Sequence, residues 1–377
     1  MSASAVATPF TAADTEAMRH ALGLAALGMN STDPNPRVGC VLVRDGKVVG
    51  EGWHERAGEG HAEARALQHA GGAAAGATAY VTLEPCAAQG RTPPCTQALI
   101  GAGIRRVIFA AGDPNPRMRG GAEQLRQAGI DVREGLLAAE ARALNPGFFK
   151  RNEQGLPWVR VKLGASLDGR TALASGESRW ITSNEARHDT QLYRARSSAV
   201  LSGIGTVLAD DPALNVRLKG ANRQPLCVIL DSQLRTPIGA RLLNRAGAKL
   251  IFCAGDNSGQ VDAVLAERRA ALEARGVRIE EVPGAGGALD LQVVLRRLAQ
   301  LECNELWVEA GARLAGAFIA ANLVDELIVY IAPSLMGHQA RPLAELPVLE
   351  HLQDRPQFTF TDVTRVGSDV RLTLARA

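Results

Sequence analysis

The sequence predicts a two-domain α/β protein, and three observations carry that prediction. The chain has 377 residues, and because domains usually span about 100–200 residues, two domains are expected. Hydrophobic residues make up 46% of the chain and charged residues 21%, which is enough apolar material for two cores. Strand and helix patterns alternate on both sides of the polar segment 150–157. We therefore expect one domain over residues 1–149 and another over residues 150–377.

In the first of these domains the residue pattern predicts a sheet covered by helices. Asp14 can cap a helix over residues 15–29. Two β-branched runs, 38–43 and 48–53, flank Arg44-Asp45-Gly46-Lys47, and Asp-Gly between such runs is a strong hairpin signal. The remaining elements alternate helix and strand, beginning with a helix, and are expected at 61–70, 79–83, 94–102, 106–111, 120–128, 130–133 and 136–145.

The second half also alternates strands with helices, which predicts a mostly parallel sheet. Its helices are expected at residues 184–195, 260–275 and 312–321. Its strands are expected at 158–164, 198–202, 226–231, 249–253, 277–282, 305–309 and 325–332, followed by a closing hairpin at 357–366 and 369–375.

Charge, hydropathy and cysteine usage exclude several classes of protein. The formal net charge is only +3, which does not favour a nucleic-acid or membrane-surface partner. The leader MSASAVATPF lacks a basic segment and an apolar core, so we expect no signal peptide. No apolar run approaches the ~18–20 residues of a membrane span. The six cysteines are sparse, which indicates free thiols or metal ligands and a cytoplasmic location.

The strongest functional signal is His61-Ala62-Glu63, followed by Pro85-Cys86 and, after eight more residues, by Cys95. One imidazole and two thiolates are the ligand set of a catalytic zinc ion that keeps a fourth position open for water. Zinc lowers the pKa of that water towards ~7, which makes hydroxide available at neutral pH. Glu63 lies near a helix start beside the metal, where it can carry a proton from the water to a departing amine.

Two less specific interpretations of these residues stay open. His61 could cap a helix while the cysteines fill a core, or the zinc could be structural. A structural zinc usually has four protein ligands, and His54 is the candidate for the fourth. Zinc nucleobase deaminases carry H-x-E and P-C-x-x-C, whereas this chain has a longer cysteine spacing. The occurrence of all parts in order, on a helix–strand–helix frame, favours the catalytic interpretation.

At these residues the chain resembles the bifunctional riboflavin-biosynthesis deaminase/reductase family, whose pattern includes the long cysteine spacing. The first-half segments that carry the resemblance are Asn35-Pro36-Arg37-Val38-Gly39-Cys40, Gly60-His61-Ala62-Glu63, Val81-Thr82-Leu83-Glu84-Pro85-Cys86, Gly90-Arg91-Thr92-Pro93-Pro94-Cys95 and Asp113-Pro114-Asn115-Pro116. The second-half segments are Lys162-Leu163-Gly164-Ala165-Ser166-Leu167-Asp168-Gly169-Arg170, Ser175-Gly176-Glu177-Ser178-Arg179-Trp180-Ile181-Thr182-Ser183, Ala209-Asp210-Asp211-Pro212 and Trp307-Val308-Glu309-Ala310-Gly311. The resemblance spans nearly the whole chain.

The resemblance implies a cytidine-deaminase-like α/β/α sandwich followed by a dihydrofolate-reductase-like α/β domain, in a homodimer. It implies removal of the exocyclic amine of 2,5-diamino-6-ribosylamino-4-pyrimidinone 5′-phosphate as ammonia. It then implies reduction of the ribosyl side chain to ribityl with NADPH. The resemblance also implies that His61, Cys86 and Cys95 bind zinc and that Glu63 transfers the proton.

Further positions match residues that surround the substrate in the family's deaminase site, namely Asn35, His54, Arg91, Asp113 and Asn115. Asn-Pro and Asp-Pro-Asn-Pro are also common turn formers, so ordinary turn chemistry is the alternative. The chain departs from the family after the first zinc cysteine, where Ala87-Ala88-Gln89 stands in place of the usual one or two histidines. Gln89 is the candidate to supply the missing polar contact.

The reductase half carries weak nucleotide fingerprints. Gly203-Ile204-Gly205-Thr206 lacks the third glycine of G-x-G-x-x-G, so we do not expect a Rossmann site. Residues 309–316, a strand that runs into a glycine-containing helix start, make a better phosphate cradle because free N–H groups and the helix dipole meet there. The alternative is that glycine in this segment only allows the helix to pack closely against the strand. Arg194 and Arg217 could clamp the substrate phosphate, or could be solvated surface charges.

The resemblance assigns contacts in this half residue by residue. The implied NADP contacts are Gly164, Trp180, Thr206, Asp210, Ser232, Gly311, Ala312, Arg313, Leu314, Ala315, Gly316 and Ala317. The implied substrate contacts are Ser178, Arg194, Leu214, Arg217 and Glu309. Hydride transfer needs no protein nucleophile, so the main task is to position the nicotinamide against C1 of the opened ribose. The sequence singles out no proton donor.

Two rival functions remain at this point. One is a deaminase of free nucleosides or tRNA, fused to an unrelated domain. The other is a zinc-stabilised scaffold without activity. The cysteine spacing and the absence of a basic face disfavour the first, and ammonia release from the pyrimidine substrate would exclude the second.

Overall fold

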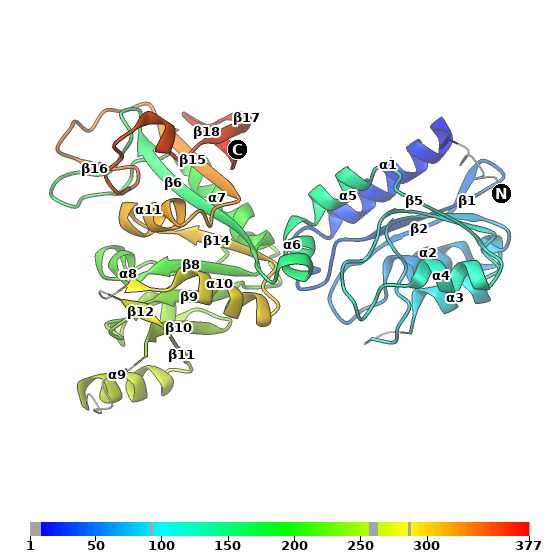
Figure 1. Ribbon diagram of the computed structural model, residues 1–377, viewed down its shortest axis with the longest axis horizontal. Helices are drawn as coiled ribbons and strands as arrows, with labels where there is room; N and C mark the ends of the chain where they lie inside the picture. The colour runs from blue at the N-terminus through cyan, green and yellow to red at the C-terminus, as the bar shows by residue number, and fades with distance from the viewer. Residues whose placement is uncertain (1–8, 91–92, 256–262, 286–287, 377) are drawn as a thin grey trace. The chain divides into compact units, whose positions relative to one another are not determined.

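The computed structural model describes residues 9–90, 93–255, 263–285 and 288–376. The chain divides into two compact units, one ending at Gln154 and the other beginning at Gly155 (Figure 1). Each unit has its own sheet and its own hydrophobic cores, so each is described by itself. In the part of the chain that the structure describes, no helix is long and apolar enough to cross a membrane.

The first unit is built on a five-stranded sheet with the order β2-β1-β3-β4-β5. Its strands are β1 (Gly39–Arg44), β2 (Lys47–Trp53), β3 (Thr78–Leu83), β4 (Arg106–Ala111) and β5 (Asp131–Glu134). β1 pairs antiparallel with β2 and β3, whereas β3, β4 and β5 run parallel. Asp45 and Gly46 join β1 to β2 with φ values of 50° and 74°, which is the geometry that the expected Asp-Gly hairpin requires.

Helices cover both faces of this sheet, which confirms the α/β/α sandwich (Figure 1). On one face α1 (Ala12–Leu27) and α5 (Ala138–Leu144) contribute buried residues such as Met18 and Ala141. On the other face lie α2 (Ala62–Ala70), α3 (Cys95–Gly101) and α4 (Gly121–Gln127), with residues such as Leu99. The zinc-ligand candidates therefore come from one side of the sheet.

Two local features of this unit differ from expectation. Thr11, not Asp14, is the N-cap of α1. The Thr11 side chain accepts the Asp14 N–H while the Asp14 carboxylate accepts the Thr11 N–H, so the two form a capping box. A further helix, α6 (Pro146–Gln154), overlaps the polar segment at the expected boundary. It forms because Phe148 and Phe149 at its start pack into the core beneath α1 and α5.

The second unit is built on a nine-stranded sheet with the order β11-β10-β9-β8-β14-β6-β15-β18-β17. Its strands are β6 (Trp158–Ser166), β8 (Ala199–Gly203), β9 (Leu226–Leu230), β10 (Lys249–Ala254), β11 (Arg278–Val282), β14 (Glu305–Glu309), β15 (Glu326–Ala332), β17 (Phe358–Val366) and β18 (Asp369–Arg376). In the order of the sheet, the seven strands from β11 across to β15 are parallel. The hairpin of β18 and β17 is added antiparallel to β15. The mostly parallel sheet and the closing hairpin are confirmed.

This sheet is also covered on both faces, by two groups of helices. One core contains residues of α7 (Asn184–Arg196), α8 (Ile204–Asp210) and α9 (Ala263–Glu273). The other contains residues of α10 (Leu291–Gln300) and α11 (Ala312–Ala320). The shorter elements of the chain are β7 (Arg170–Ala172), β12 (Gly284–Ala285), β13 (Ala288–Leu289), β16 (Arg341–Pro342) and the 3-10 turns Gly71–Ala74, Arg241–Asn244 and Leu352–Asp354.

The helices α8 and α10 were not among those expected from the sequence. The helix expected at 260–275 is α9, and its first expected residues lie outside the described residues. A signal for α10 was present, because Asp290 caps its first turn by accepting the N–H groups of Gln292 and Val293.

The close approach of α1 to β1 allows a test of the first unit's packing. A Cβ added to Gly39 would lie 2.0 Å from the carbonyl oxygen of Ala21, whereas one added to Gly23 would meet nothing within 4 Å. We expect Gly39→Ala to lower the free energy of unfolding by about 1–3 kcal/mol, because α1 must move off the sheet. Gly23→Ala, on the exposed face of the same helix, should raise it by about 0.5–1 kcal/mol. Urea-dependent hydrogen exchange of β1 measures both; equal effects would contradict this packing.

Candidate functional site

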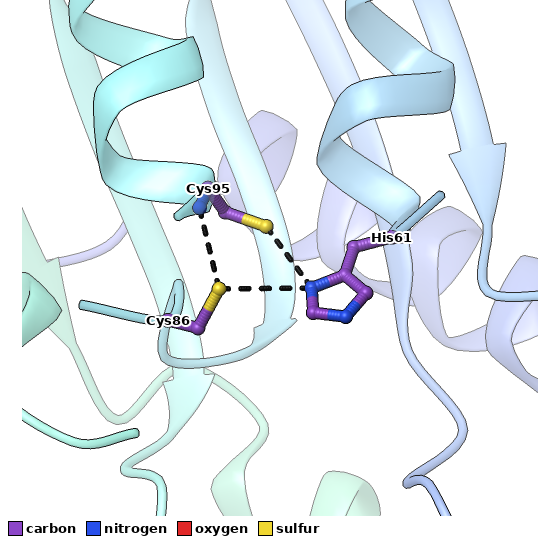
Figure 2. Close-up of side chains that lie close together, drawn as sticks. All are labelled: His61, Cys86 and Cys95. Carbon is purple, nitrogen blue, oxygen red and sulfur yellow. Dashed lines mark hydrogen bonds between the residues drawn. The ribbon is translucent and has the colours of Figure 1, made fainter. Parts of the chain in front are cut away.

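Three side chains of the first unit converge on one point, as Figure 2 shows. His61 immediately precedes α2, Cys86 follows β3, and Cys95 is the first residue of α3. The His61 Nδ1 atom lies 3.2 Å from the Cys95 sulfur and 3.6 Å from the Cys86 sulfur. These three residues, here called the zinc group, form the metal-ligand cluster found among the described residues, with ligand atoms all within 4.8 Å of one another. A soft, three-ligand set of this kind fits zinc.

The electrostatics of the zinc group already favour a thiolate. A hydrogen bond with the Cys95 thiol is the largest cause that lowers the pKa of Cys86, to about 4. The Cys95 backbone N–H also donates to the Cys86 sulfur at 3.2 Å. In return the hydrogen bond with Cys86 raises the pKa of the His61 imidazole and of the Cys95 thiol. A dication would therefore meet one thiolate and draw the proton from the second.

Glu63 lies in the first turn of α2, directly beside the zinc group. Its side chain is only 3% exposed, and burial raises the pKa of its carboxyl, opposed by the nearby His61 charge. It is not one of the three clustered ligand residues. A buried carboxyl next to a metal but outside its ligand set is placed to exchange protons with a metal-activated water.

His54 lies beside the zinc group but not in it. One ring nitrogen is 3.0 Å from the Asn35 side-chain nitrogen, and the other is 3.3 Å from the Gly60 carbonyl oxygen. Its ring meets the His61 ring edge-on at 5.4 Å. Burial lowers the pKa of His54, which favours a neutral ring. The interpretation of His54 as a fourth zinc ligand is therefore not supported, while its pairing with Asn35 places both residues next to the zinc group.

Asp113 and Asn115 lie on the loop that follows β4. Burial raises the pKa of Asp113 to about 6, and the charge on Cys86 contributes. The Asp113 carboxylate accepts the Asn115 N–H at 2.8 Å, and Asn115 accepts the Arg117 N–H at 3.1 Å. These hydrogen bonds are those of an ordinary turn, and the interaction of Asp113 with Cys86 places the same turn near the zinc group. Arg91 lies outside the described residues, and Gln89 is exposed.

The second unit contains a large cavity of about 1340 Å³ at the carboxyl ends of its central strands. The expected NADP and substrate positions that line it are Gly164, Ser178, Trp180, Arg194, Thr206, Asp210, Leu214, Arg217, Ser232, Glu309, Gly311, Ala312, Arg313, Leu314 and Ala317. Ala315 and Gly316 do not line it. Ala315 is fully buried in the core, and a Cβ on Gly316 would lie 1.9 Å from the Glu345 carbonyl oxygen, so this glycine allows close packing of α11.

Two strand-to-helix turns open into this cavity. Gly311 is the N-cap of α11, and a Cβ added there would meet nothing within 4 Å. The turn from β8 into α8, with Gly203 and Thr206, lines the same cavity. Because β8 and β14 are neighbouring parallel strands, both turns lie at one edge of the sheet. Exposed N–H groups at such an edge suit the pyrophosphate of a nucleotide cofactor.

Glu309 is held in this cavity by three donors. The Arg194 Nη2 and the Trp307 indole N–H each donate to its carboxylate at 2.8 Å, and the Arg194 Nε donates as well. Although burial disfavours the charge, the Arg194 guanidinium holds the pKa of Glu309 at about 2. Arg194 also donates to the Asn215 carbonyl. The two arginines expected to clamp the phosphate therefore differ in their surroundings, because Arg194 is paired with Glu309 whereas Arg217 is one of several exposed arginines that line the cavity.

Sequence reasoning assigned no role to Lys162, which lines the cavity next to Glu309. The two residues are paired across β6 and β14. Burial lowers the pKa of the Lys162 ammonium, with the Glu309 charge opposing. A signal was available, because Lys162 is a charged residue within an otherwise largely apolar central strand.

Comparison with known proteins gives one consistent result for both units. The family model described as RibD C-terminal domain matches residues 157–372, and that of the cytidine and deoxycytidylate deaminase zinc-binding region matches residues 11–111. Riboflavin biosynthesis protein RibD of Escherichia coli (strain K12) is 50% identical over 96% of this chain and 98% of its own length. RibD of Haemophilus influenzae is 47% identical over 97% and 98%.

Solved structures agree with the sequence comparison. Acinetobacter baumannii RibD, form 1, has a TM-score of 0.88 and 42% identity over 97% of this chain and 99% of that chain. A diaminohydroxyphosphoribosylaminopyrimidine deaminase/5-amino-6-(5-phosphoribosylamino)uracil reductase of Thermotoga maritima has a TM-score of 0.83 and 30% identity over the same shares. The two units thus have the cytidine-deaminase-like and dihydrofolate-reductase-like folds. The chain belongs to the RibD family of bifunctional riboflavin-biosynthesis enzymes, which combine a zinc-dependent deaminase with an NADPH-dependent reductase.

Proposed function

We propose that this chain catalyses two successive steps on one phosphorylated aminopyrimidine. Residues 1–149 remove the exocyclic amine of 2,5-diamino-6-ribosylamino-4-pyrimidinone 5′-phosphate, and residues 150–377 reduce the ribosyl side chain of the product to ribityl. The observation that carries this proposal is the zinc group with buried Glu63 beside it. Family membership supports both halves.

In the deaminase site, His61, Cys86 and Cys95 would hold the zinc ion. Zinc would supply a water whose pKa is lowered towards ~7. Glu63 accepts a proton from that water and delivers it to the departing amine, a transfer that its raised pKa favours. His54 and its hydrogen-bond partner Asn35 would hold the pyrimidine ring next to the zinc ion.

In the reductase site, NADPH would supply the hydride that C1 of the opened ribose receives. Glu309 stays anionic at neutral pH, so it accepts a hydrogen bond from a substrate hydroxyl and does not donate a proton. Lys162 is the ammonium beside it in the cavity wall, and we assign it as the proton donor to the ring oxygen released on opening. We assign the substrate phosphate to Arg217, which is one of several exposed arginines that line the cavity.

A deaminase test isolates Glu63. We expect Glu63→Gln to reduce ammonia release about 10²- to 10⁴-fold, because the proton shuttle is lost. The zinc content should stay that of the parent, because Glu63 is not among the clustered ligand residues. Ammonia release and metal analysis measure the two effects. NADPH oxidation with the deaminated intermediate is the internal control, and ammonia release at the parent rate would refute the assigned role.

A reductase test isolates Lys162. The donor must be an ammonium, and burial lowers its pKa below the ordinary 10.5. The kcat for NADPH oxidation should therefore fall as the pH rises through that lowered pKa. We expect Lys162→Met to lower kcat about 10²- to 10⁴-fold while NADPH still binds. The basic limb of the pH profile should vanish in the variant; a limb that persists there would assign the proton to another group.

We also propose that the chain works as a cytoplasmic homodimer without a nucleic-acid or membrane partner. The exposed apolar side chains Phe360 and Val363, each 61% exposed, lie on the edge strand β17, and an unpaired apolar edge is a surface that a second copy can cover. Light scattering should give a dimer mass for the parent and a lower mass for Phe360→Glu. A monomeric parent would exclude this arrangement.

A further inference from the structure

Glu84 anchors a distant loop beside the zinc group, and neither reaction has so far given it a role. It follows the last residue of β3 and lies two residues before the zinc ligand Cys86. Its carboxylate accepts three backbone N–H groups from one segment: Asp113 at 3.2 Å, Gly120 at 3.1 Å and Ala122 at 3.0 Å. These donors belong to residues 113–122, which are the loop before α4 together with the first two residues of that helix and are here called the substrate loop. The substrate loop carries Asp113 and Asn115.

The residues after Glu84 contact the same loop. A Cβ added to Gly121 would lie 1.8 Å from the Pro85 carbonyl oxygen, and the Ala87 N–H donates to the Met118 carbonyl at 2.9 Å. Residues 84–87 therefore carry a zinc ligand and, on both sides of it, contacts to the substrate loop. The distance between the metal and the loop is set through this short segment.

Within the loop, the hydrogen bonds fix its shape but not its place. Asp113 accepts the Asn115 N–H, and the Asn115 carbonyl accepts the N–H groups of Met118 and Arg119. Such bonds would move with the loop as a unit. The Glu84 carboxylate, by contrast, joins both ends of the loop to the exit of β3, and bonds from N–H groups to a carboxylate are stronger than those to a neutral acceptor.

We propose that Glu84 is a positioning residue that sets Asp113 and Asn115 at their working distance from the zinc group. The proposal rests on the deaminase function proposed above. A misplacement of about 1 Å in a substrate-contacting group can cost about 100-fold in rate. We expect the metal ligands to keep their places without the Glu84 contacts, because the Cys86 carbonyl accepts the Thr96 N–H at 3.4 Å and Cys95 begins α3.

The test compares Glu84→Gln with Glu123→Gln. The glutamine introduced by Glu84→Gln keeps one acceptor oxygen but turns an NH₂ group towards backbone donors, so one end of the loop loses its anchor. Glu123 is exposed on α4 and accepts only the Gln127 side chain among the hydrogen bonds found for it, which makes it the matched control. We expect Glu84→Gln to raise the deaminase KM, lowering kcat/KM about 10- to 100-fold, and Glu123→Gln to change neither.

Two further readouts separate positioning from general damage. The zinc content and the visible spectrum of the Co²⁺-substituted protein should match the parent, and NADPH oxidation by the second unit should be unchanged. Hydrogen exchange of the Asp113, Gly120 and Ala122 amides should quicken in Glu84→Gln and not in Glu123→Gln. Glu84→Asp, which keeps the charge on a shorter side chain, should give an intermediate KM and serves if the glutamine variant does not fold.

The outcomes that would overturn the proposal are distinct. An unchanged KM or unchanged amide exchange would show that Glu84 does not place the loop. A changed cobalt spectrum or lost zinc would make Glu84 a support of the metal ligands instead. A parent enzyme that releases no ammonia would sink the proposed deaminase function, whereas the exchange measurement would still decide whether Glu84 anchors the loop.

Discussion

The first unit depends on bringing two sulfurs and an imidazole together in a buried place. Such a cluster is unfavourable unless positive charge compensates the thiolates. Part of that compensation is built into the fold, because His61 precedes α2 and Cys95 begins α3, and the positive ends of helix dipoles favour thiolates. Both helices pack on the same face of the sheet. The packing that buries Ala62, Ala66 and Leu99 therefore also fixes the metal ligands.

The second unit uses neighbouring strands in a comparable way. Parallel strands β8 and β14 end side by side and each runs into a helix, so their turns form one wall of the cavity without the full glycine fingerprint of a Rossmann fold. Of the cradle expected at 309–316, residues 309–314 line the cavity, whereas Gly316 allows close packing of α11. The sequence could not show that the Gly203-Ile204-Gly205-Thr206 turn faces the same cavity, because that depends on strand order.

The chemistry of the zinc site was predictable because residue type and spacing determine it. His61, Glu63, Cys86 and Cys95 indicate it without knowledge of the fold. Strand positions were predictable because buried parallel strands form apolar runs bounded by turn residues. Glu84 and Lys162 were not found, since their roles arise from partners far along the chain, such as Gly120 and Glu309. Long-range pairing of this kind leaves no local signature for Glu84, and the local signal for Lys162, a charged side chain in a largely apolar strand, does not identify its partner.

Arg194 shows how such pairing changes the interpretation of a motif residue. Read alone, an arginine near a phosphorylated substrate is a phosphate ligand. In the folded chain its guanidinium meets the buried Glu309 carboxylate, and removal of either partner would leave an uncompensated buried charge. The pair keeps Glu309 anionic, and an anion beside Lys162 favours the ammonium form that burial opposes. In the proposed reduction Arg194 would therefore act through Glu309 on Lys162, although its own charge opposes the ammonium form of Lys162 directly.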